Sequence, residues 1–433
     1  MRRWAVLAVV VIAGVAIYVS VRALIGRRSG PPVPTRRQPA ATRCSVTLRP
    51  GADVAQAIVT ADDGETICLE GGSYARIDVS NAHHGGYVTV APAPGAVAVV
   101  DGVQTSADTF LRFRGLTMTA GFDLVGPGAA SHDLQFIDND IGHTTYGIVV
   151  NGAGAPIRNV LIQGNSIHDL DFSGPSPGYA GGQGVTVYWG SYITVRDNAF
   201  WANSWHYIQC GSCDHMAVEH NLFTGPSNAH PGAHLNVWQI WQGGSGDSFT
   251  DNAVIGAPGA PIADGAILWE TGPGGATLSD SYSDMTVSDN LFVDEDSTTT
   301  LDLAASSGLT VTDNTIVGSG YGLLVRGRCT CAAGFDRPGT GYDISGNIVV
   351  ADANPGARFR VLCPASGACG DGNVSDDGSA RSAFPGAARW VTDWSPRWVT
   401  TQWDASRLAT PPAGYYEPVG LGIDAGARAG TAP

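Results

Sequence analysis

The stretch LQFIDNDI at residues 134–141 decides the fold, because its pattern of an alternating apolar strand followed by asparagine occurs seven more times. The other copies are VLIQGNSI (160–167), ITVRDNAF (193–200), MAVEHNLF (216–223), SFTDNAVI (248–255), MTVSDNLF (285–292), LTVTDNTI (309–316) and YDISGNIV (342–349). Their asparagines are Asn139, Asn165, Asn198, Asn221, Asn252, Asn290, Asn314 and Asn347, at intervals of 26, 33, 23, 31, 38, 24 and 33 residues. A repeat of about two dozen residues with insertions of unequal length indicates a solenoid.

Each copy has a period of two rather than 3.6, so the repeating unit is a strand. Asparagine tolerates the left-handed backbone conformation that a sharp corner requires, and we expect the repeated asparagines to adopt it. In successive coils they would stack about 4.8 Å apart and hydrogen-bond through their side-chain amides. A second strand precedes most copies, at 146–150, 184–188, 206–210, 237–241, 265–269, 299–303 and 322–325. The sequence therefore predicts an all-β, single-stranded parallel β-helix with room for a short third strand in each coil.

Residues 4–21 form an uncharged apolar run with arginines on both sides. This length is just enough to span a bilayer as a helix, and a cleaved signal peptide ending near Ala23 is the alternative. Positive charge is heavier after the run, which on the positive-inside rule alone would place the rest of the chain in the cytoplasm. We expect a signal-anchor or transmembrane segment at 1–28, a Pro-rich linker at 29–43, a β-helix at 44–375 and a C-terminal capping or tail segment at 376–433.

The eight cysteines favour an oxidising compartment, since their even number suits disulfides. They are Cys44, Cys68, Cys210, Cys213, Cys329, Cys331, Cys363 and Cys369. This outweighs the arginine distribution, so we expect a membrane-anchored extracellular domain or a secreted protein. Zinc binding by the close pairs Cys210/Cys213 and Cys329/Cys331 is the alternative.

Charge changes sign along the chain. The first 43 residues hold 8 of the 24 basic residues and no acidic one, so the remainder has 16 basic against 39 acidic residues, a net charge of −23. Such a surface repels nucleic acid, and polyanionic sugars too unless a cation intervenes, although solubility alone is a sufficient explanation. We expect a monomer with no nucleic-acid partner.

The two ends of the predicted β-helix are similar to those of a known group. CSVTLRPGADVAQAIVTADDGETICLEGGSY (44–74) and ASRLATPPAGYYEPVGLGIDAGA (405–427) resemble the opening and closing segments of right-handed parallel β-helix proteins of the pectin-lyase-like superfamily, in their exported, carbohydrate-active form. The resemblance implies a right-handed coil, a short N-terminal capping helix near residues 52–61 and a bond between Cys44 and Cys68. It implies little about activity, because this fold hosts lyases, hydrolases, epimerases, adhesins and phage spikes.

Long insertions at 166–183, 222–234 and 253–264 should gather at one corner of the coil stack, and a groove beside them is the expected site. If Val185 points inward, strand parity turns a set of polar and aromatic side chains outward on this face. The outward set is Thr186, Tyr188, Gln209, Gln239, Trp241, Ile267 and Trp269. Aromatic rings beside amides suit a sugar, by stacking and by hydrogen bonds, while packing beneath the insertions is the alternative interpretation.

Titratable side chains lie at the rim of this face, namely His206, His230, His234, Asp264 and Glu270, and all of them except His230 are candidate catalytic residues. The phrase His234-Leu-Asn236-Val-Trp-Gln239 resembles a His-x-Asp-x-x-Gln phrase of carbohydrate-active β-helix proteins, with Asn236 in place of the aspartate and therefore without its carboxylate. His206 or His234 can serve as acid or base, and Asp264 with Glu270 can form an acid/base pair. A lysine base is excluded, because the chain has no lysine, and residues 159–325 contain no arginine but Arg196.

No cofactor is certain from the sequence, but Ca²⁺ is a candidate. Acidic residues at Asp171, 294–296 and 376–377 can bind it, which would let a uronate approach an acidic protein, while solvated corners are the alternative. We expect a protein that binds, and in the stronger form of the hypothesis cleaves, an extracellular polysaccharide through Tyr188, Gln209, Asn236, Gln239, Trp241 and Trp269. The competing hypothesis is a non-catalytic surface or adhesin-like β-helix.

Overall fold

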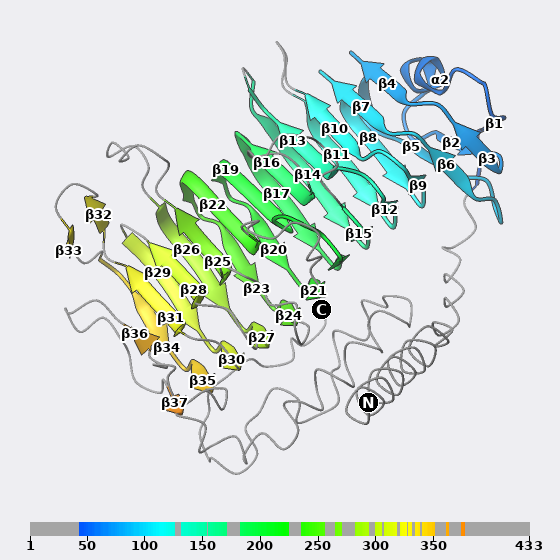
Figure 1. Cartoon of the computed structure of the whole chain (residues 1–433). Helices are drawn as coiled ribbons and strands as arrows, with labels where there is room; N and C mark the ends of the chain where they lie inside the picture. The colour runs from blue at the N-terminus through cyan, green and yellow to red at the C-terminus, as the bar shows by residue number, and fades with distance from the viewer. Residues whose placement is uncertain are drawn as a thin grey trace, which may run out of the picture.

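The computed structural model describes residues 43–125, 131–153, 155–170, 182–224, 235–255, 265–270, 282–293, 299–304, 307–317, 321–326, 328–330, 334–337, 340–350, 361–362 and 374–376. Nearly all of its regular structure is parallel β-strand, coiled into a three-faced stack that runs from β1 to β37 in chain order (Figure 1). The predicted all-β parallel β-helix is confirmed.

The first face carries the strands that precede each asparagine strand. It consists of β4 (Ile77–Ser80), β7 (Val103–Ser106), β10 (Phe122–Val125), β13 (Tyr146–Asn151), β16 (Gln183–Tyr188), β19 (Ile208–Asp214), β22 (Asn236–Ser245), β25 (Gly265–Glu270), β28 (Thr299–Ala304), β31 (Tyr321–Arg326) and β36 (Val361–Leu362), paired in this order. The predicted second strands between residues 146 and 325 correspond to the first-face strands from β13 to β31.

The second face carries the asparagine strands themselves. Its members are β1 (Val46–Leu48), β2 (Thr66–Leu69), β5 (His83–Pro92), β8 (Thr109–Arg114), β11 (His132–Ile137), β14 (Ile157–Gln163), β17 (Gly190–Arg196), β20 (Ala217–Glu219), β23 (Ser248–Thr250), β26 (Tyr282–Ser288), β29 (Ser307–Thr312) and β34 (Asp343–Ser345). Burial alternates along these strands, as in β11, β17 and β26, because alternate side chains point into the coil.

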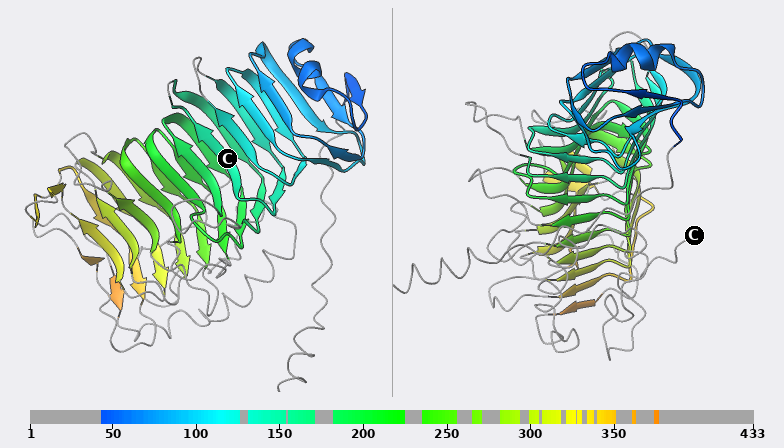
Figure 2. Two further views of the ribbon diagram at one scale, coloured as in Figure 1. Left: turned by 45° about the horizontal axis from the view of Figure 1, so that its top comes forward. Right: turned by 90° about the vertical axis from the view of Figure 1, so that its right-hand side faces the viewer.

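The third face consists of short strands after each corner. These are β3 (Gly72–Tyr74), β6 (Ala98–Val100), β9 (Thr117–Met118), β12 (Asp140–Gly142), β15 (Ser166–His168), β18 (Ala199–Trp201), β21 (Leu222–Thr224), β24 (Ala253–Ile255), β27 (Leu291–Val293), β30 (Thr315–Val317), β35 (Ile348–Val350) and β37 (Val374–Asp376). A short antiparallel pair, β32 (Arg328–Thr330) and β33 (Gly334–Arg337), lies outside the stack. Figure 2 shows the faces from two further directions.

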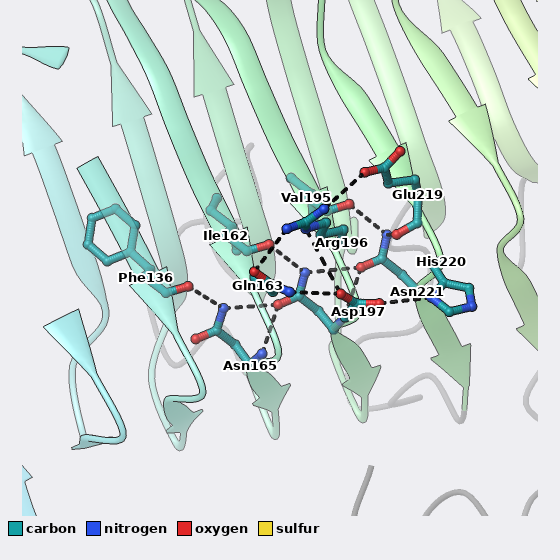
Figure 3. A network of polar contacts seen from close by, with 11 residues as sticks. Phe136, Ile162, Gln163, Asn165, Val195, Arg196, Asp197, Glu219, His220 and Asn221 are labelled. Carbon is teal, nitrogen blue, oxygen red and sulfur yellow. Dashed lines mark hydrogen bonds and ion pairs between the residues drawn. The ribbon is translucent and has the colours of Figure 1, made fainter. Parts of the chain in front are cut away.

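The repeated asparagines form one continuous hydrogen-bonded ladder inside the corner between the second and third faces. In each step the backbone N–H and the side-chain amide of one asparagine both donate to Oδ1 of the next, from Asn139 to Asn347. Each Nδ2 also donates to a backbone carbonyl of the preceding coil, as from Asn165 to Phe136 and from Asn221 to Val195 (Figure 3). The predicted ladder is confirmed.

The predicted backbone conformation of these asparagines is wrong. The left-handed residue is the one before each asparagine: Asp138, Gly164, Asp197, His220, Asp251, Asp289, Asp313 and Gly346, with φ between 53° and 67°. This residue turns the chain at the end of the strand. The asparagine that follows is thereby free to point inward, where its amide is buried and completes the ladder.

At the N-terminal end, α2 (Val54–Thr60) lies beside β4 and β5 (Figure 1). Its N-cap Asp53 accepts a hydrogen bond from the backbone of Gln56 at 2.9 Å, and Val54 and Ile58 are buried in the core. The helix thus occurs within the expected residues, and its capping role stays a prediction. The implied bond between Cys44 and Cys68 is present, with the two Cα atoms 5.5 Å apart.

Cys210 and Cys213 also form a disulfide, which links the two ends of the corner that β19 crosses between the first and second faces. The zinc alternative for this pair is therefore wrong, and the side chains of the pair at 329 and 331 lie outside the described residues. No helix in the described ranges is long and apolar enough to cross a membrane. Residues 4–21, which were expected to do so, are not among those ranges.

Candidate functional site

Successive first-face strands stack as the sequence predicts. The register aligns Thr186 with Gln209 and Gln239, and Tyr188 with Gly211 and Trp241. Each long insertion joins a third-face strand to a first-face strand, so all of them meet the same corner, as expected; residues 171–181, 225–234 and 256–264 themselves lie outside the described part.

Polar side chains of three coils form a hydrogen-bonded row on this face. Thr186 Oγ1 donates to Gln183 Oε1 at 2.7 Å, Gln183 Nε2 donates to Gln209 Oε1 at 2.8 Å, and Gln209 Nε2 donates to Gln239 Oε1 at 3.2 Å. Thr186, Gln183 and Gln239 are only 2%, 4% and 8% exposed. The row is therefore largely a buried support, and Gln209 is its more accessible member.

Tyr188 links this polar row to the aromatic column beside it. Its hydroxyl donates to Gln209 Oε1 at 3.3 Å, and its ring meets Trp241 edge to face at 5.9 Å. Gly211 lies between the two rings, and a Cβ there would lie 3.0 Å from Tyr188 and 3.1 Å from Trp241. Burial, followed by the nearby Tyr146, raises the pKa of Tyr188, so its hydroxyl stays a neutral donor at physiological pH.

His206, just before β19, contacts Asn236, the first residue of β22. Nδ1 of His206 accepts from the backbone N–H of Asn236 at 3.3 Å, and both residues are buried. Strand β22 also carries buried polar atoms that find no hydrogen-bond partner among the described residues, including Nδ2 and Oδ1 of Asn236 and Nε1 of Trp241. Buried polar atoms are rarely left unpaired, so these atoms indicate a place for water or a polar ligand.

Two exposed aromatic residues were missed in the sequence. Trp189 lies between β16 and β17, and Tyr192 is the third residue of β17. They are 47% and 55% exposed and have left-handed backbones with φ of 53° and 54°. Trp189 lies beside Tyr188, and the ring of Tyr192 stacks on His215 at 4.8 Å. We call Tyr188, Trp189, Tyr192 and Trp241 the aromatic ridge.

The expected outward orientation of Ile267 is wrong. Ile267 is fully buried and in register with the buried Trp238, and the register pairs Trp269 with Ile240 and Glu270 with Trp241. The expectation counted back from the following asparagine strand, but residues 271–281 intervene between β25 and β26. Substrate contact by Trp269 stays a prediction, as do the catalytic roles of His206 and Glu270.

The remaining site candidates lie outside the described residues. These are His230, His234 and Asp264, and the acidic residues Asp171, 294–296 and 377. Within the described ranges no three histidine, cysteine or carboxylate side chains gather as a metal site. The described residues of the site provide aromatic rings, amides and hydroxyls, which bind ligands by stacking and hydrogen bonding.

Residues 128–281, which include β11 through β25, match the family model described as the right-handed beta helix region. This part of the chain is a right-handed parallel β-helix. Solved β-helix structures similar to it include pectate lyase Pel9A (12% identity, 78% of this chain and 81% of that chain, TM-score 0.44). Others are PfbA, a surface adhesin of Streptococcus pneumoniae (11%, 64% and 84%, TM-score 0.47), and the PL6 family polysaccharide lyase Pedsa3628 from Pseudopedobacter saltans (13%, 77% and 93%, TM-score 0.49). Comparison with curated proteins gives no match.

Proposed function

We propose that this β-helix binds a polysaccharide along the aromatic ridge, with the first face as its support. The observation that carries the proposal is the pair Trp189 and Tyr192. A bulky side chain in the left-handed region costs about 1–2 kcal/mol, and each of these rings leaves about half of its surface in water.

Neighbouring coils show that the corner does not need aromatic residues. Trp189 follows Tyr188, and the residues that follow its register partners Gly211 and Trp241 are Ser212 and Gln242. Tyr192 follows Ser191, and the residues that follow the aligned Asp214 and Ser245 are His215 and Gly246; all four have positive φ. Small or polar residues therefore suffice for the turn. An exposed ring in this conformation is explained by a partner that covers it, and the C–H face of a sugar is such a partner.

Hydrogen-bonding groups lie next to the rings. Gln209 is partly accessible beside Tyr188, and Nε1 of Trp241 has no hydrogen-bond partner among the described residues. Rings that stack on a sugar and amides that bind its hydroxyls are the two components of a carbohydrate site. The disulfides Cys44–Cys68 and Cys210–Cys213 support an exported protein, since such bonds persist in oxidising compartments.

Binding of the purified full chain to a panel of immobilised polysaccharides tests this function. We expect saturable binding to at least one of them, and about tenfold weaker binding for Trp241→Ala, since one lost stacking ring is worth about 1.4 kcal/mol. A suitable control is Trp201→Ala, because Trp201 lies on the third face, stacked on His168 at 4.4 Å. Undiminished binding by Trp241→Ala would exclude the ridge, and no binding by the parent protein would favour an adhesin-like structural role.

A further inference from the structure

The charge of the chain near the aromatic ridge restricts what kind of polysaccharide can bind. Arg196 is the one lysine or arginine in residues 159–325, a range that includes every strand from β16 to β28 and all the segments between them. A groove formed by these coils, with or without their insertions, therefore contains no other lysine or arginine.

Arg196 is engaged at the other end of its strand. It is the last residue of β17, whereas the ridge residue Trp189 precedes the first, so about 20 Å separates them along a seven-residue strand. There Nη2 of Arg196 donates to Gln163 Oε1 at 3.3 Å, and the guanidinium lies 4.0 Å from carboxylates of Asp197 and Glu219 (Figure 3). Its charge is therefore paired with carboxylates at the corner beside the asparagine ladder.

The charged groups nearer the ridge are few and of both signs. Asp214 is the last residue of β19, three residues after Gly211. Its side chain is half exposed, and Nδ1 of His215 lies 3.2 Å from its carboxylate. Arg158 on β14 is exposed and in register with Ser191, next to Tyr192, at the N-terminal end of the ridge. Glu270, in register with Trp241, adds a second acidic residue. One arginine among two acidic residues cannot neutralise the repeated carboxylates of a polyuronate.

We infer that the ligand of the aromatic ridge is an uncharged polysaccharide, held by ring stacking and by amide and hydroxyl hydrogen bonds. This inference rests on the proposed function. Each carboxylate of a polyuronate would lose water against a face whose one nearby arginine, Arg158, lies at its end, on a protein region of net charge −23 (16 − 39). A neutral sugar meets no such cost, and every group it would touch on this face can donate or accept a hydrogen bond or stack.

The test compares neutral and acidic ligands for the purified full chain. Binding constants are measured by calorimetry for a panel of neutral polysaccharides and for polyuronates, each with EDTA and with added Ca²⁺. For any neutral polysaccharide that binds, oxidation of its primary hydroxyls to carboxylates supplies a matched charged ligand. We expect the oxidised form to bind at least tenfold more weakly, and binding of the neutral form to be unchanged by EDTA.

The Arg158→Gln variant tests whether the ligand is held by the charge of Arg158. We expect it to bind the neutral polysaccharide within twofold of the parent protein. Tighter binding of polyuronates than of any neutral ligand, dependence on Ca²⁺, or a loss greater than tenfold in Arg158→Gln would each overturn the inference while leaving glycan binding intact. Failure to bind any ligand of either class would instead overturn the proposed function, and this inference with it.

Discussion

Replacement of Asn221 by alanine is expected to lower the free energy of unfolding by roughly 3–5 kcal/mol, since it interrupts the asparagine ladder at its middle. Oδ1 of Asn221 accepts from both the backbone N–H and the side-chain amide of Asn198, at 3.0 Å each. Its Nδ2 donates to Val195 O and to Asn252 Oδ1. Alanine would leave the buried N–H of Asn198 and the carbonyl of Val195 without these partners.

Urea unfolding followed by circular dichroism measures this loss. A matched control is Asn159→Gly. Asn159 is exposed, its side chain has one hydrogen bond within the described ranges, at 3.4 Å to Asp133, and glycine adopts its φ of 56° without strain. We expect less than about 1 kcal/mol from the control. A loss of similar size from both variants would show that the ladder contributes no more than an exposed asparagine.

The second large effect concerns Asp247, a carboxyl group in the core. The register places it between the fully buried Met216 and Met285, in an inward column that is otherwise apolar. Oδ1 accepts from the backbone N–H of Met216 at 2.6 Å, whereas Oδ2 is buried with no partner. Burial, with a smaller contribution from the charge of Asp214, raises the pKa of Asp247 to about 7, against the hydrogen bond from Met216 and the charge of His215.

A raised pKa makes the native state the tighter proton binder, so this group favours folding most below its unfolded pKa of about 4. The contribution is lost as the pH rises from there through 7, by ~4 kcal/mol between pH 4 and pH 8. Asp247→Asn keeps an oxygen for Met216 and cannot ionise. We therefore expect the variant to gain stability over the parent protein as the pH rises, by up to that amount.

Urea unfolding of both proteins from pH 4 to pH 8 checks this result. Asp284→Asn is the control, since Asp284 is an exposed carboxyl group on the next coil, and its difference from the parent should stay below about 1 kcal/mol throughout. A stability difference between Asp247→Asn and the parent that does not change with pH would contradict the buried-carboxylate explanation.

The sequence predicts the fold well because the asparagine ladder ties one residue type to one place in every coil. Alternation within the strands then places the first face correctly up to Trp241. It fails at Ile267, which is buried, since counting across an insertion cannot give the parity of the strand before it. Asp247 carried a signal that was not used: aligning DSFTDN with MAVEHN and MTVSDN puts the aspartate at a methionine position.

Trp189 and Tyr192 could not be predicted as exposed ridge residues. In the sequence they flank an apolar strand, where aromatic residues are ordinarily buried. Only the backbone shows that both occupy left-handed corners, which turn their rings away from the core. Gly211 is similar, because its role follows from the two rings that meet across it in space.

The measurement that tests glycan binding by the ridge most directly is the paired affinity and stability of Trp189→Asn. Asparagine tolerates the left-handed conformation, so relief of strain should offset the lost packing of a half-exposed ring, and stability should change by less than about 1 kcal/mol. Gln242→Asn is the control that removes no ring, because Gln242 follows Trp241, two coils from Tyr188 in the same column, and also has a positive φ. We predict about tenfold weaker polysaccharide binding for Trp189→Asn with unchanged stability and no loss in the control. Unchanged affinity, or a loss of stability near 3 kcal/mol that marks Trp189 as a packing residue, would contradict the account.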